Sequence, residues 1–435
     1  MEAAQPIGVG MLGLGVVGSG VARALDSQAQ TLARRVGAPL DLRKVLVRDL
    51  SRPRAVDLPP YLLTQDPDQV LDDPQVQVVL EVMGGESPAS DYIRRALRSG
   101  KHVVTANKEV MAKEGPELLA LADSQGVSLQ LEGSVGGAIP IIGSLTRDLL
   151  ANRINSIHAI INGTTNFILT CIADEGMDGD QALKLAQNLG YAEANPFNDV
   201  EGVDAAYKLS ILASLAFHTK VRPQQVHREG ILDLKPKDFR YARELGYAIK
   251  LLAIARRLDD SLEVRVHPVL IPEGHLLAKV SGVYNAVEVE ANLLGRVVFH
   301  GLGAGAEPTA SAVLGDLVDI GRRITSKSRA PWSLQMEERL TVREISDLET
   351  RYYFRLNVAE KAGVLAQITR VLGDLNISIA SVIQKGSDLE RQTAELVITT
   401  HPAREADVQR SLSLLKDLEV VTEVNSLIRV EELPS

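Results

Sequence analysis

The sequence predicts an α/β protein of three parts, and three observations support this class. An apolar segment at residues 7–12 leads into a glycine-rich turn, and strand-like and helix-like segments then alternate. The middle of the chain mixes helical runs with segments of alternating hydrophobicity, and the last part reads strand, helix, strand, strand, helix, strand. We expect a parallel-sheet α/β domain, an α+β domain and a ferredoxin-like βαββαβ module. The expected boundaries are 1–131 with a returning segment at about 303–330, then 132–302, a linker at 331–350, and 351–435.

Composition and charge exclude several classes of function. The 435 residues are 45% hydrophobic, which is enough for two or three separate cores. The formal net charge of −9, without a long basic stretch, argues against nucleic acid and anionic membranes as partners. No apolar run reaches the roughly 18 residues of a membrane span, so we expect a cytoplasmic protein with small-molecule partners. Cys171 is the only cysteine, which excludes an internal disulfide.

The first glycine-rich turn has the G-x-G-x-x-G spacing of a Rossmann-type dinucleotide-binding loop, placed between an expected strand and an expected helix from Ser19 to Leu25. Glycines let the backbone approach a pyrophosphate, whose charge meets the free N–H groups of the helix start. The next expected strand, Leu42–Val47, ends in Arg48 and Asp49. Arg48 suits a 2′-phosphate and Asp49 a ribose hydroxyl, so NADP is favoured while NAD stays open. The candidate loop residues are Gly13, Leu14, Gly15, Val16, Val17 and Gly18.

Two more expected strands of this domain end in glycine or polar residues. The run 76–83 stops at Gly84, and the strand 101–105 ends in Thr105 just before Lys108. Carboxyl ends of parallel strands are where such sheets bind ligands, so these three residues are candidate cofactor contacts. A cation at a helix start opposes the helix dipole, which makes Lys108 unusual, although an ordinary solvated lysine is the alternative. Helices are expected at 87–98 and 113–124.

Two later glycine-rich segments have different interpretations. The segment 132–140 carries Glu132, which together with exposed carbonyl groups can bind a cation, or its glycines serve only tight packing at a hinge. The segment 301–305 is followed by a single expected helix, 309–322, so no second βαβ unit can form. We expect this loop, with Gly303, to return to the first domain and touch the cofactor.

The stretch from Gly190 to Phe217 brings acids and a lysine to the start of a buried helix. The pattern is helical from Val203, and Asp204 and Lys208 are four residues apart, so they share one helix face. Such a pair is usually a solvated surface bridge. Here residues 209–217 are apolar almost all round, which favours a helix inside the protein with its charges at the edge of a cleft.

The remaining elements complete the expected domains. The polar residues 162–166 follow an expected strand at 155–161, and they either line a pocket or cap the helix 167–174. A long helix is expected over 239–258, and strands over 261–270 and 285–290.

With these motifs the chain resembles bacterial homoserine dehydrogenases that carry a C-terminal ACT domain. The resemblance covers essentially the whole chain, and its most specific stretches are GLGVVGSG at 13–20, TANK at 105–108, NGTTNF at 162–167, and GYAEANP at 190–196 followed by DVEGVDAAYK. It implies NAD(P)H-dependent reduction of L-aspartate 4-semialdehyde to L-homoserine, on the route to threonine and methionine.

The resemblance also implies roles for single residues. Lys208 would donate the proton to the carbonyl, with Lys108 close to the reacting carbon. Glu193 would hold the substrate ammonium, and Asp204 would position the amino acid and Lys208. The implied sodium site consists of Glu132 with the backbone carbonyls of Val135, Gly137 and Ile139.

The ACT module implies an amino-acid effector, usually threonine, and a homodimer or homotetramer. Its turn, Glu360–Gly363, lacks the proline often found before the glycine, so the effector stays open. Two alternatives remain beside this reading: another NAD(P)-dependent amino-acid reductase or dehydrogenase, and a non-catalytic sensor of nucleotides and amino acids. The paired lysines near acids speak against the sensor.

Overall fold

The computed structural model describes residues 5–328, 336, 339–388 and 392–433. The chain forms two compact units, each made of three segments. The first unit contains residues 1–157, 207–226 and 284–340, and the second contains 158–206, 227–283 and 341–435. This division differs from the expected domain boundaries, because the chain passes from one unit to the other inside β7 (Ile154–Ile160) and inside α10 (Val203–Ala216).

A six-stranded parallel sheet forms the centre of the first unit. Its strand order, β3-β2-β1-β4-β5-β6, is that of doubly wound dinucleotide-binding sheets. β1 and β4 are buried along their whole length, which explains why their sequences do not alternate and are apolar except for Glu81 at the end of β4. The strands are β1 (Ile7–Leu12), β2 (Leu40–Leu46), β3 (Leu63–Thr64), β4 (Val78–Glu81), β5 (His102–Thr105) and β6 (Leu129–Gln130).

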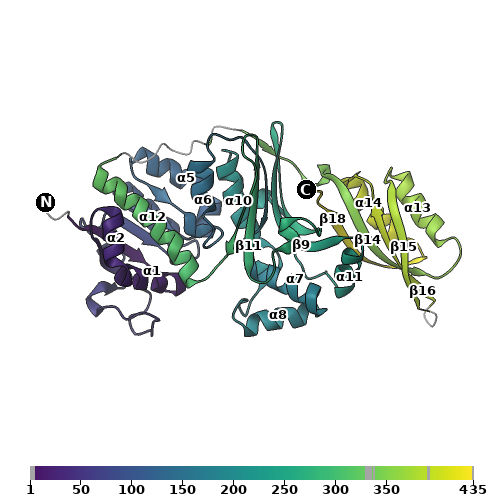
Figure 1. Ribbon diagram of the computed structural model, residues 1–435, viewed down its shortest axis with the longest axis horizontal. Helices are drawn as coiled ribbons and strands as arrows, with labels where there is room; N and C mark the ends of the chain where they lie inside the picture. Colours follow the sequence, from purple (N-terminus) through teal and green to yellow (C-terminus); the bar gives the residue numbers. More distant parts are fainter. Residues whose placement is uncertain (1–4, 329–335, 337–338, 389–391, 434–435) are drawn as a thin grey trace. The chain divides into compact units, whose positions relative to one another are not determined.

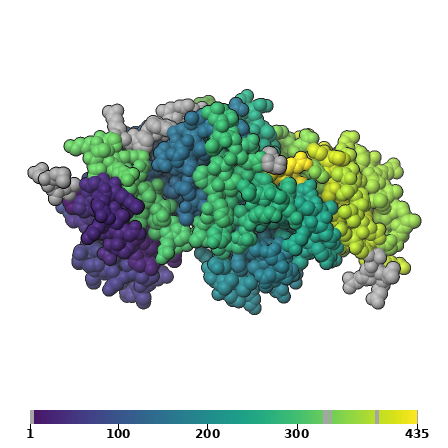
Figure 2. All heavy atoms as spheres, in the orientation of Figure 1, coloured from purple at the N-terminus to yellow at the C-terminus, as the bar shows by residue number. Residues whose placement is uncertain are grey.

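Helices cover this sheet, and the last of them comes from far along the chain. α12 packs against α1 and α2 (Figure 1), and its green atoms lie beside the purple N-terminal residues in Figure 2. Gly20 of α1 makes this packing close, because a Cβ atom there would lie 2.8 Å from the carbonyl oxygen of Ala306. The helices are α1 (Val16–Ser27), α2 (Ala29–Val36), α3 (Asp68–Leu71), α4 (Ala89–Arg98), α5 (Lys108–Ser124), α6 (Ile141–Gly143) and α12 (Ala306–Ser326). The antiparallel pair β11 (Tyr284–Ala291) and β12 (Gly295–Leu302) also belongs to this unit.

In the second unit the prediction of one long helix over 239–258 is wrong. The helix α11 (Pro236–Glu244) ends early, and Gly246 adopts a left-handed φ of 80°. The following residues form β9 (Tyr247–Leu258), antiparallel to β10 (Ser261–Pro272). Most of β9 is buried on both faces, so its apolar run lacks the alternation that distinguishes a strand from a helix. The other elements are α7 (Gly163–Glu175), α8 (Gly179–Asn188), α9 (Phe197–Val200) and β8 (His227–Arg228).

The C-terminal module confirms the βαββαβ order. Its strands lie in the order β18-β14-β16-β15. β18 also pairs in parallel with β10, where Val269 opposes Arg429, so the module's sheet continues into β10 and β9. In the expected linker at 331–350, residues 331–335 and 337–338 lie outside the described residues, a short strand, β13 (Thr341–Val342), lies beside β10, and the first strand of the module already begins at Glu349. The module comprises β14 (Glu349–Ala359), α13 (Val364–Asp374), β15 (Ile379–Asp388), β16 (Thr393–Thr400), α14 (Glu405–Lys416) and β18 (Val421–Val430).

Within the described part of the chain, no helix has the length and apolar character that crossing a membrane requires.

Candidate active site

The first glycine-rich loop borders a cavity of about 690 Å³ in the first unit. Gly13 has a left-handed φ of 103°, and a Cβ atom on Gly18 would lie 2.4 Å from the carbonyl oxygen of Gly13. These two glycines are therefore required by the fold of the loop. Gly15 differs, because a Cβ atom there would meet nothing within 4 Å, so its backbone faces open space. A loop that is tight on one side and open on the other fits the approach of a pyrophosphate.

Basic residues from the end of β2 line the same cavity. Arg48, Arg52 and Arg54 contribute to its wall together with Asp49. The Asp49 carboxylate accepts hydrogen bonds from the backbone N–H and the hydroxyl of Ser51, at 2.8 and 2.7 Å, and these bonds lower its pKa. Asp49 therefore already has local partners. The Arg54 guanidinium donates to the carbonyl oxygen of Arg52 at 2.9 Å, while Arg48 and Arg52 also line the cavity.

Glu81, at the end of β4, is a buried acid at the carboxyl edge of the parallel sheet that the sequence analysis did not single out. Its side chain is completely buried and accepts a hydrogen bond of 2.6 Å from the Thr105 hydroxyl and one of 2.9 Å from the Met83 N–H. Burial raises the pKa of Glu81, and these hydrogen bonds act against that rise. The sequence does contain a sign of this residue, because Glu81 is a single acid at the end of an otherwise apolar strand.

The residues after β5 connect the two strand ends that the sequence singled out. The Asn107 side chain donates to the carbonyl oxygen of Gly85 at 2.7 Å and accepts from the Val110 N–H at 3.2 Å. The second bond caps α5, which is why this helix begins at Lys108 and not at residue 113. Asn107 thus fixes the turn that contains Gly84 next to the first turn of α5, from which the half-buried Lys108 projects.

An acidic cluster forms in the second unit at the start of α10. The Asn162 side chain donates to the carboxylates of Asp199, at 2.7 Å, and Asp204, at 2.9 Å. Its oxygen accepts the Thr165 N–H at 2.8 Å and caps α7. The sequence left pocket lining and capping as alternatives for residues 162–166, and Asn162 caps a helix while also holding two carboxylates together.

The helix α10 carries its two charged residues in buried positions. Asp204 is 3% exposed and Lys208 is 9% exposed, which rules out a solvated surface bridge. Beside them, the Lys113 ammonium lies 5.9 Å from the centre of the Tyr207 ring. Burial of a lysine and an aspartate one turn apart is costly, and such an arrangement is typical of functional sites.

The loop that carries Glu193 is fixed, whereas the Glu193 side chain is exposed. Thr164 donates to the carbonyl oxygen of Tyr191 at 2.7 Å, and the Tyr191 ring lies edge-on to Phe167 at 5.0 Å. The carbonyl oxygen of Glu193 accepts from the Gln187 side chain. An exposed carboxylate on an anchored loop can meet a ligand.

Glu132 has protein partners on both carboxylate oxygens. It accepts from the N–H groups of Ile142, at 2.8 Å, and Gly143, at 2.7 Å, at the start of α6. Its own N–H donates to Asp316 at 2.9 Å, and burial raises the pKa of both acids. The described residues contain no cluster of three or more His, Cys, Asp or Glu side chains suited to a metal ion.

The second and third glycine-rich segments pack against each other. A Cβ atom on Gly137 would lie 2.6 Å from the carbonyl carbon of Gly303, and the Ala138 N–H donates to Leu302 at 3.1 Å. The buried Asn285 side chain packs against the other side of Gly303, where a Cβ atom would lie 2.0 Å from its amide nitrogen. Gly303 therefore packs directly against the turn that contains Val135 and Ile139.

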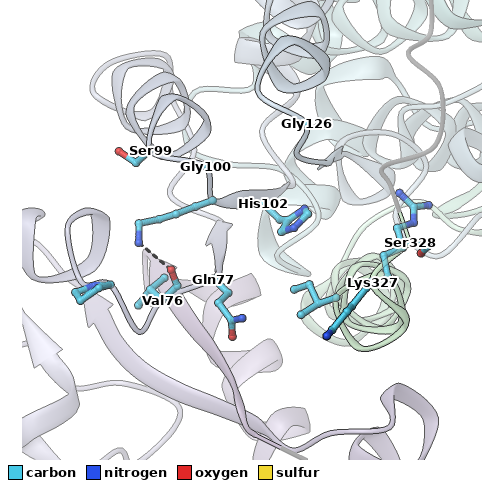
Figure 3. Close-up of a pocket in the computed structure, with 12 residues that line it drawn as sticks. Val76, Gln77, Ser99, Gly100, His102, Gly126, Lys327 and Ser328 are labelled. Atoms are coloured by element: carbon cyan, nitrogen blue, oxygen red, sulfur yellow. Dashed lines mark hydrogen bonds between the residues drawn. The ribbon is translucent and has the colours of Figure 1, made fainter.

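A second cavity of about 520 Å³ lies at the opposite, amino-terminal edge of the parallel sheet (Figure 3). Lys101, His102 and Arg323 contribute to its wall. The Lys101 ammonium already donates to the carbonyl oxygens of Asp73, at 2.6 Å, and Val76, at 2.8 Å. None of the residues singled out from the sequence lines this cavity.

The sheet order, the open glycine-rich loop and the buried lysine of α10, followed by a βαββαβ module, indicate the class of NAD(P)-dependent oxidoreductases. Family models agree in three segments: the NAD-binding domain of homoserine dehydrogenase matches residues 13–132, homoserine dehydrogenase matches 140–318, and the ACT domain matches 352–420. The chain belongs to the homoserine dehydrogenase family.

Individual relatives match along nearly the whole chain. A homoserine dehydrogenase of Synechocystis is 44% identical over 432 residues, which is 97% of this chain and 99% of the relative. The crystal structure of a homoserine dehydrogenase from Thiobacillus denitrificans is 43% identical with a TM-score of 0.93, and covers 99% of this chain and 100% of that one. A hyperthermophilic archaeal homoserine dehydrogenase in complex with NADPH is 26% identical with a TM-score of 0.64, over 76% of this chain and 100% of that one.

Proposed function

We propose that this chain catalyses the reduction of L-aspartate 4-semialdehyde to L-homoserine with NAD(P)H. The aldehyde carbon accepts a hydride and its oxygen accepts a proton, so the products are the alcohol and NAD(P)+. The bound nicotinamide supplies the hydride, and the glycine-rich loop with its open Gly15 would hold the cofactor. The observation that carries the proposal is the buried Lys208, one turn after the buried Asp204.

Lys208 is the proposed proton donor. Hydride addition places negative charge on the carbonyl oxygen, and a cationic acid withdrawn from water stabilises that charge and then donates its proton. Asp204, one helical turn earlier, would keep the ammonium oriented. Lys108, at the first turn of α5, is proposed to lie close to the reacting carbon and to the cofactor, together with Gly84, Thr105 and Gly303.

The acids of the second unit support an amino-acid substrate. A zwitterionic substrate needs a carboxylate for its ammonium group, and the chain offers the exposed Glu193 as well as Asp204, which Asn162 holds in place. We assign ammonium binding to Glu193 and substrate positioning to Asp204. This polar set favours a small amino acid over an apolar aldehyde.

We propose NADP as the preferred cofactor over NAD. Arg48 lies at the end of β2, where a 2′-phosphate or a ribose hydroxyl is recognised in this fold. The Asp49 carboxylate is held by Ser51, and Arg52 and Arg54 line the same cavity, so positive charge predominates. The archaeal relative with NADPH bound agrees with this preference.

A sodium ion is the proposed occupant of the turn that contains Glu132. The backbone carbonyls of Val135, Gly137 and Ile139 would supply hard oxygen ligands. We also propose threonine as an effector of the ACT module, to be tested by inhibition of the full-length enzyme.

A homodimer or homotetramer is the proposed assembly. β12 stands at the end of its sheet, and Leu293, Leu294 and Leu302 near it are 72%, 45% and 40% exposed. Apolar side chains along an edge strand favour association with a second copy. Sedimentation at several protein concentrations measures the state directly.

One assay separates the proposed reaction from its alternatives. Oxidation of NADPH and NADH is followed with aspartate semialdehyde and, separately, with other small aldehydes and oxo acids. We expect the highest kcat/KM for aspartate semialdehyde with NADPH. A higher value for another substrate would indicate a different amino-acid reductase, and nucleotide binding without turnover on any substrate would indicate a sensor.

A further inference from the structure

A buried arginine of the ACT module binds a carboxylate from outside that module. Arg429 of β18 is 3% exposed and donates to both oxygens of Glu229, at 2.8 Å each. The same guanidinium also donates to both oxygens of Glu405 in α14, at 2.8 and 2.6 Å. Arg429 thus connects a carboxylate of the module to one from the segment after β8 by charge-assisted bonds, which are the strong and directional kind.

The segment around Glu229 lies directly against the turn that precedes α10. The Ile231 N–H donates to the carbonyl oxygen of Val200 at 2.9 Å, and the Arg228 side chain donates to that of Glu201 at 3.0 Å. A Cβ atom on Gly230 would lie 2.5 Å from the Val200 oxygen, so only glycine permits this approach. A displacement of Glu229 would therefore move Val200 and Glu201.

The same turn positions the acidic cluster. Asp199 and Asp204 lie on either side of the segment 200–202, and the Asn162 side chain donates to both carboxylates. Gly202 has a left-handed φ of 73°, which few other residues adopt, and its Cβ position is 3.5 Å from the carbonyl oxygen of Glu229. A continuous set of contacts within the second unit thus runs from Arg429 to the two aspartates.

We propose that Glu229 is a positioning residue for the amino-acid substrate: it ties the turn 200–202, and through it Asp199 and Asp204, to Arg429 of the ACT module. The inference rests on the proposed function, because it assigns substrate binding to this acidic cluster. The contacts do not involve the glycine-rich loop of the cofactor, so nucleotide affinity should not respond.

The chain offers a matched control for a test of Glu229. Asp238 of α11 is also a carboxylate paired with a buried arginine of the module, Arg355, at 2.7 and 3.0 Å. Its hydrogen bonds go to Arg355, to the Tyr353 hydroxyl and to the N–H of Lys235, and not to the turn 200–202. Glu229→Gln and Asp238→Asn each remove a carboxylate that pairs with a buried arginine of the module, but only the first lies on the route to the substrate acids. The Asp238 side chain is fully buried and that of Glu229 is 40% exposed, so Asp238→Asn is the more severe change to the protein, and a larger effect in Glu229→Gln would come from its position.

The experiment compares these two variants and Glu229→Asp in the full-length protein. For Glu229→Gln we expect the KM for aspartate semialdehyde to rise about five- to tenfold, the usual size of such a coupling, with kcat and the KM for NADPH within about twofold. Asp238→Asn should leave all three constants near those of the parent. Glu229→Asp, which keeps the charge, should restore part of the affinity.

Hydrogen exchange supplies a readout that does not depend on the reaction. The amides of residues 200–206 should exchange faster in Glu229→Gln than in Asp238→Asn, whether or not the parent reduces the semialdehyde. Inactivity of the parent on that substrate would count against the proposed function alone. Unchanged exchange at 200–206 in Glu229→Gln, or an equal KM change in both variants, would overturn the role of Glu229.

Discussion

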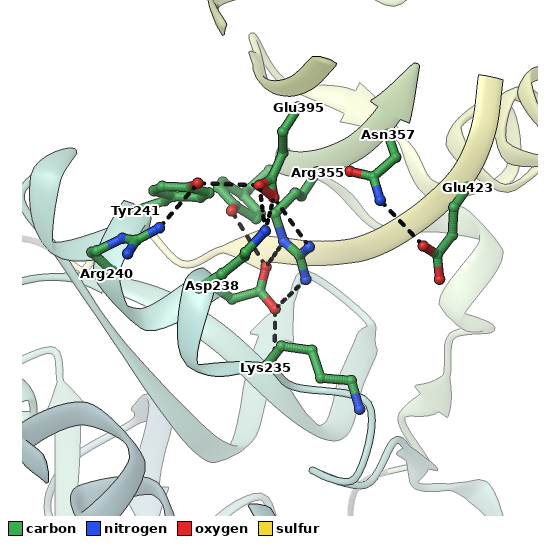
Figure 4. A network of polar contacts seen from close by, with 10 residues as sticks. Lys235, Asp238, Arg240, Tyr241, Arg355, Asn357, Glu395 and Glu423 are labelled. Atoms are coloured by element: carbon green, nitrogen blue, oxygen red, sulfur yellow. Dashed lines mark hydrogen bonds and ion pairs between the residues drawn. The ribbon is translucent and has the colours of Figure 1, made fainter. Parts of the chain in front are cut away.

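The pair of Arg355 and Asp238 gives a prediction whose size follows from the structure. Arg355 is 4% exposed and Asp238 is completely buried, and two nitrogen atoms of the guanidinium bind the two carboxylate oxygens (Figure 4). The perturbation is Arg355→Met, which removes the cation and keeps an apolar chain of similar length. Among the described residues, Asp238 then keeps hydrogen bonds from the Tyr353 hydroxyl, at 3.3 Å, and the Lys235 N–H, at 3.0 Å.

The expected cost is that of a buried charge without its counter-charge, about 3–5 kcal/mol of unfolding free energy. The double variant Arg355→Met/Asp238→Asn should recover most of this loss, because it removes both charges. Lys237→Met is the matched control: Lys237 pairs with Glu395 in the same network at 3.1 Å, but its side chain is 57% exposed. An exposed pair of this kind contributes about 0–1 kcal/mol.

Urea unfolding followed by circular dichroism measures these differences, with the slope of the transition compared among variants. The reasoning would be refuted if Arg355→Met cost no more than Lys237→Met, or if adding Asp238→Asn brought no recovery. Either result would mean that water or a rearranged neighbour replaces the guanidinium at Asp238.

Three further predictions concern the cofactor site and a buried lysine. Arg48→Ala should raise the KM for NADPH about tenfold while changing that for NADH little, since one charge-assisted phosphate contact is lost; equal changes would remove Arg48 from phosphate recognition. Gly15→Ala should weaken nucleotide binding without lowering Tm, whereas Gly18→Ala should lower Tm, because only its Cβ atom meets backbone, at 2.4 Å from Gly13; equal Tm values would contradict this. Burial lowers the pKa of Lys250 from 10.5 to about 8. The folded state therefore loses this proton before the unfolded state does, and unfolding free energy should rise between pH 8 and 10.5 by about 3 kcal/mol, at 1.36 kcal/mol per pKa unit. In Lys250→Met that rise should be absent, and its persistence would assign it to another group.

The elements that the sequence predicts correctly are those determined by local patterns of residues. The turn from Gly13 to Gly18 is specified by steric limits within a few residues, and the buried helix α10 by a run that is apolar on every face. The order of the βαββαβ module follows from alternating short segments bounded by turns. Such features need no knowledge of distant contacts, and the sequence therefore predicts them.

What the sequence could not predict depends on residues that meet across the fold. Glu81 lies at the end of an apolar strand, and its hydrogen-bond partner Thr105 lies beside it because β4 and β5 are neighbours in the sheet. The strand β9 has a helix-like apolar run, because it is buried on both faces and lacks alternation. Arg355 and Arg429 are charged residues inside strands of a module that we expected to fold independently. Their partners, Asp238 and Glu229, lie more than a hundred residues earlier in the chain, so the sequence does not reveal these pairs.

The transfer of a proton from Lys208 is the central claim, and a single-turnover experiment tests it most directly. Parent and Lys208→Ala enzymes are saturated with NADPH, mixed with aspartate semialdehyde and followed by NADPH absorbance, while the Kd for NADPH is measured separately by fluorescence. We predict a rate of NADPH oxidation lower by about 10²-fold or more in the variant, with a Kd unchanged within about twofold. An unchanged rate in the variant would contradict the assignment of Lys208 as the acid. A slow rate that returns to the parent's value at higher NADPH concentrations would contradict it too, because the defect would then lie in cofactor binding.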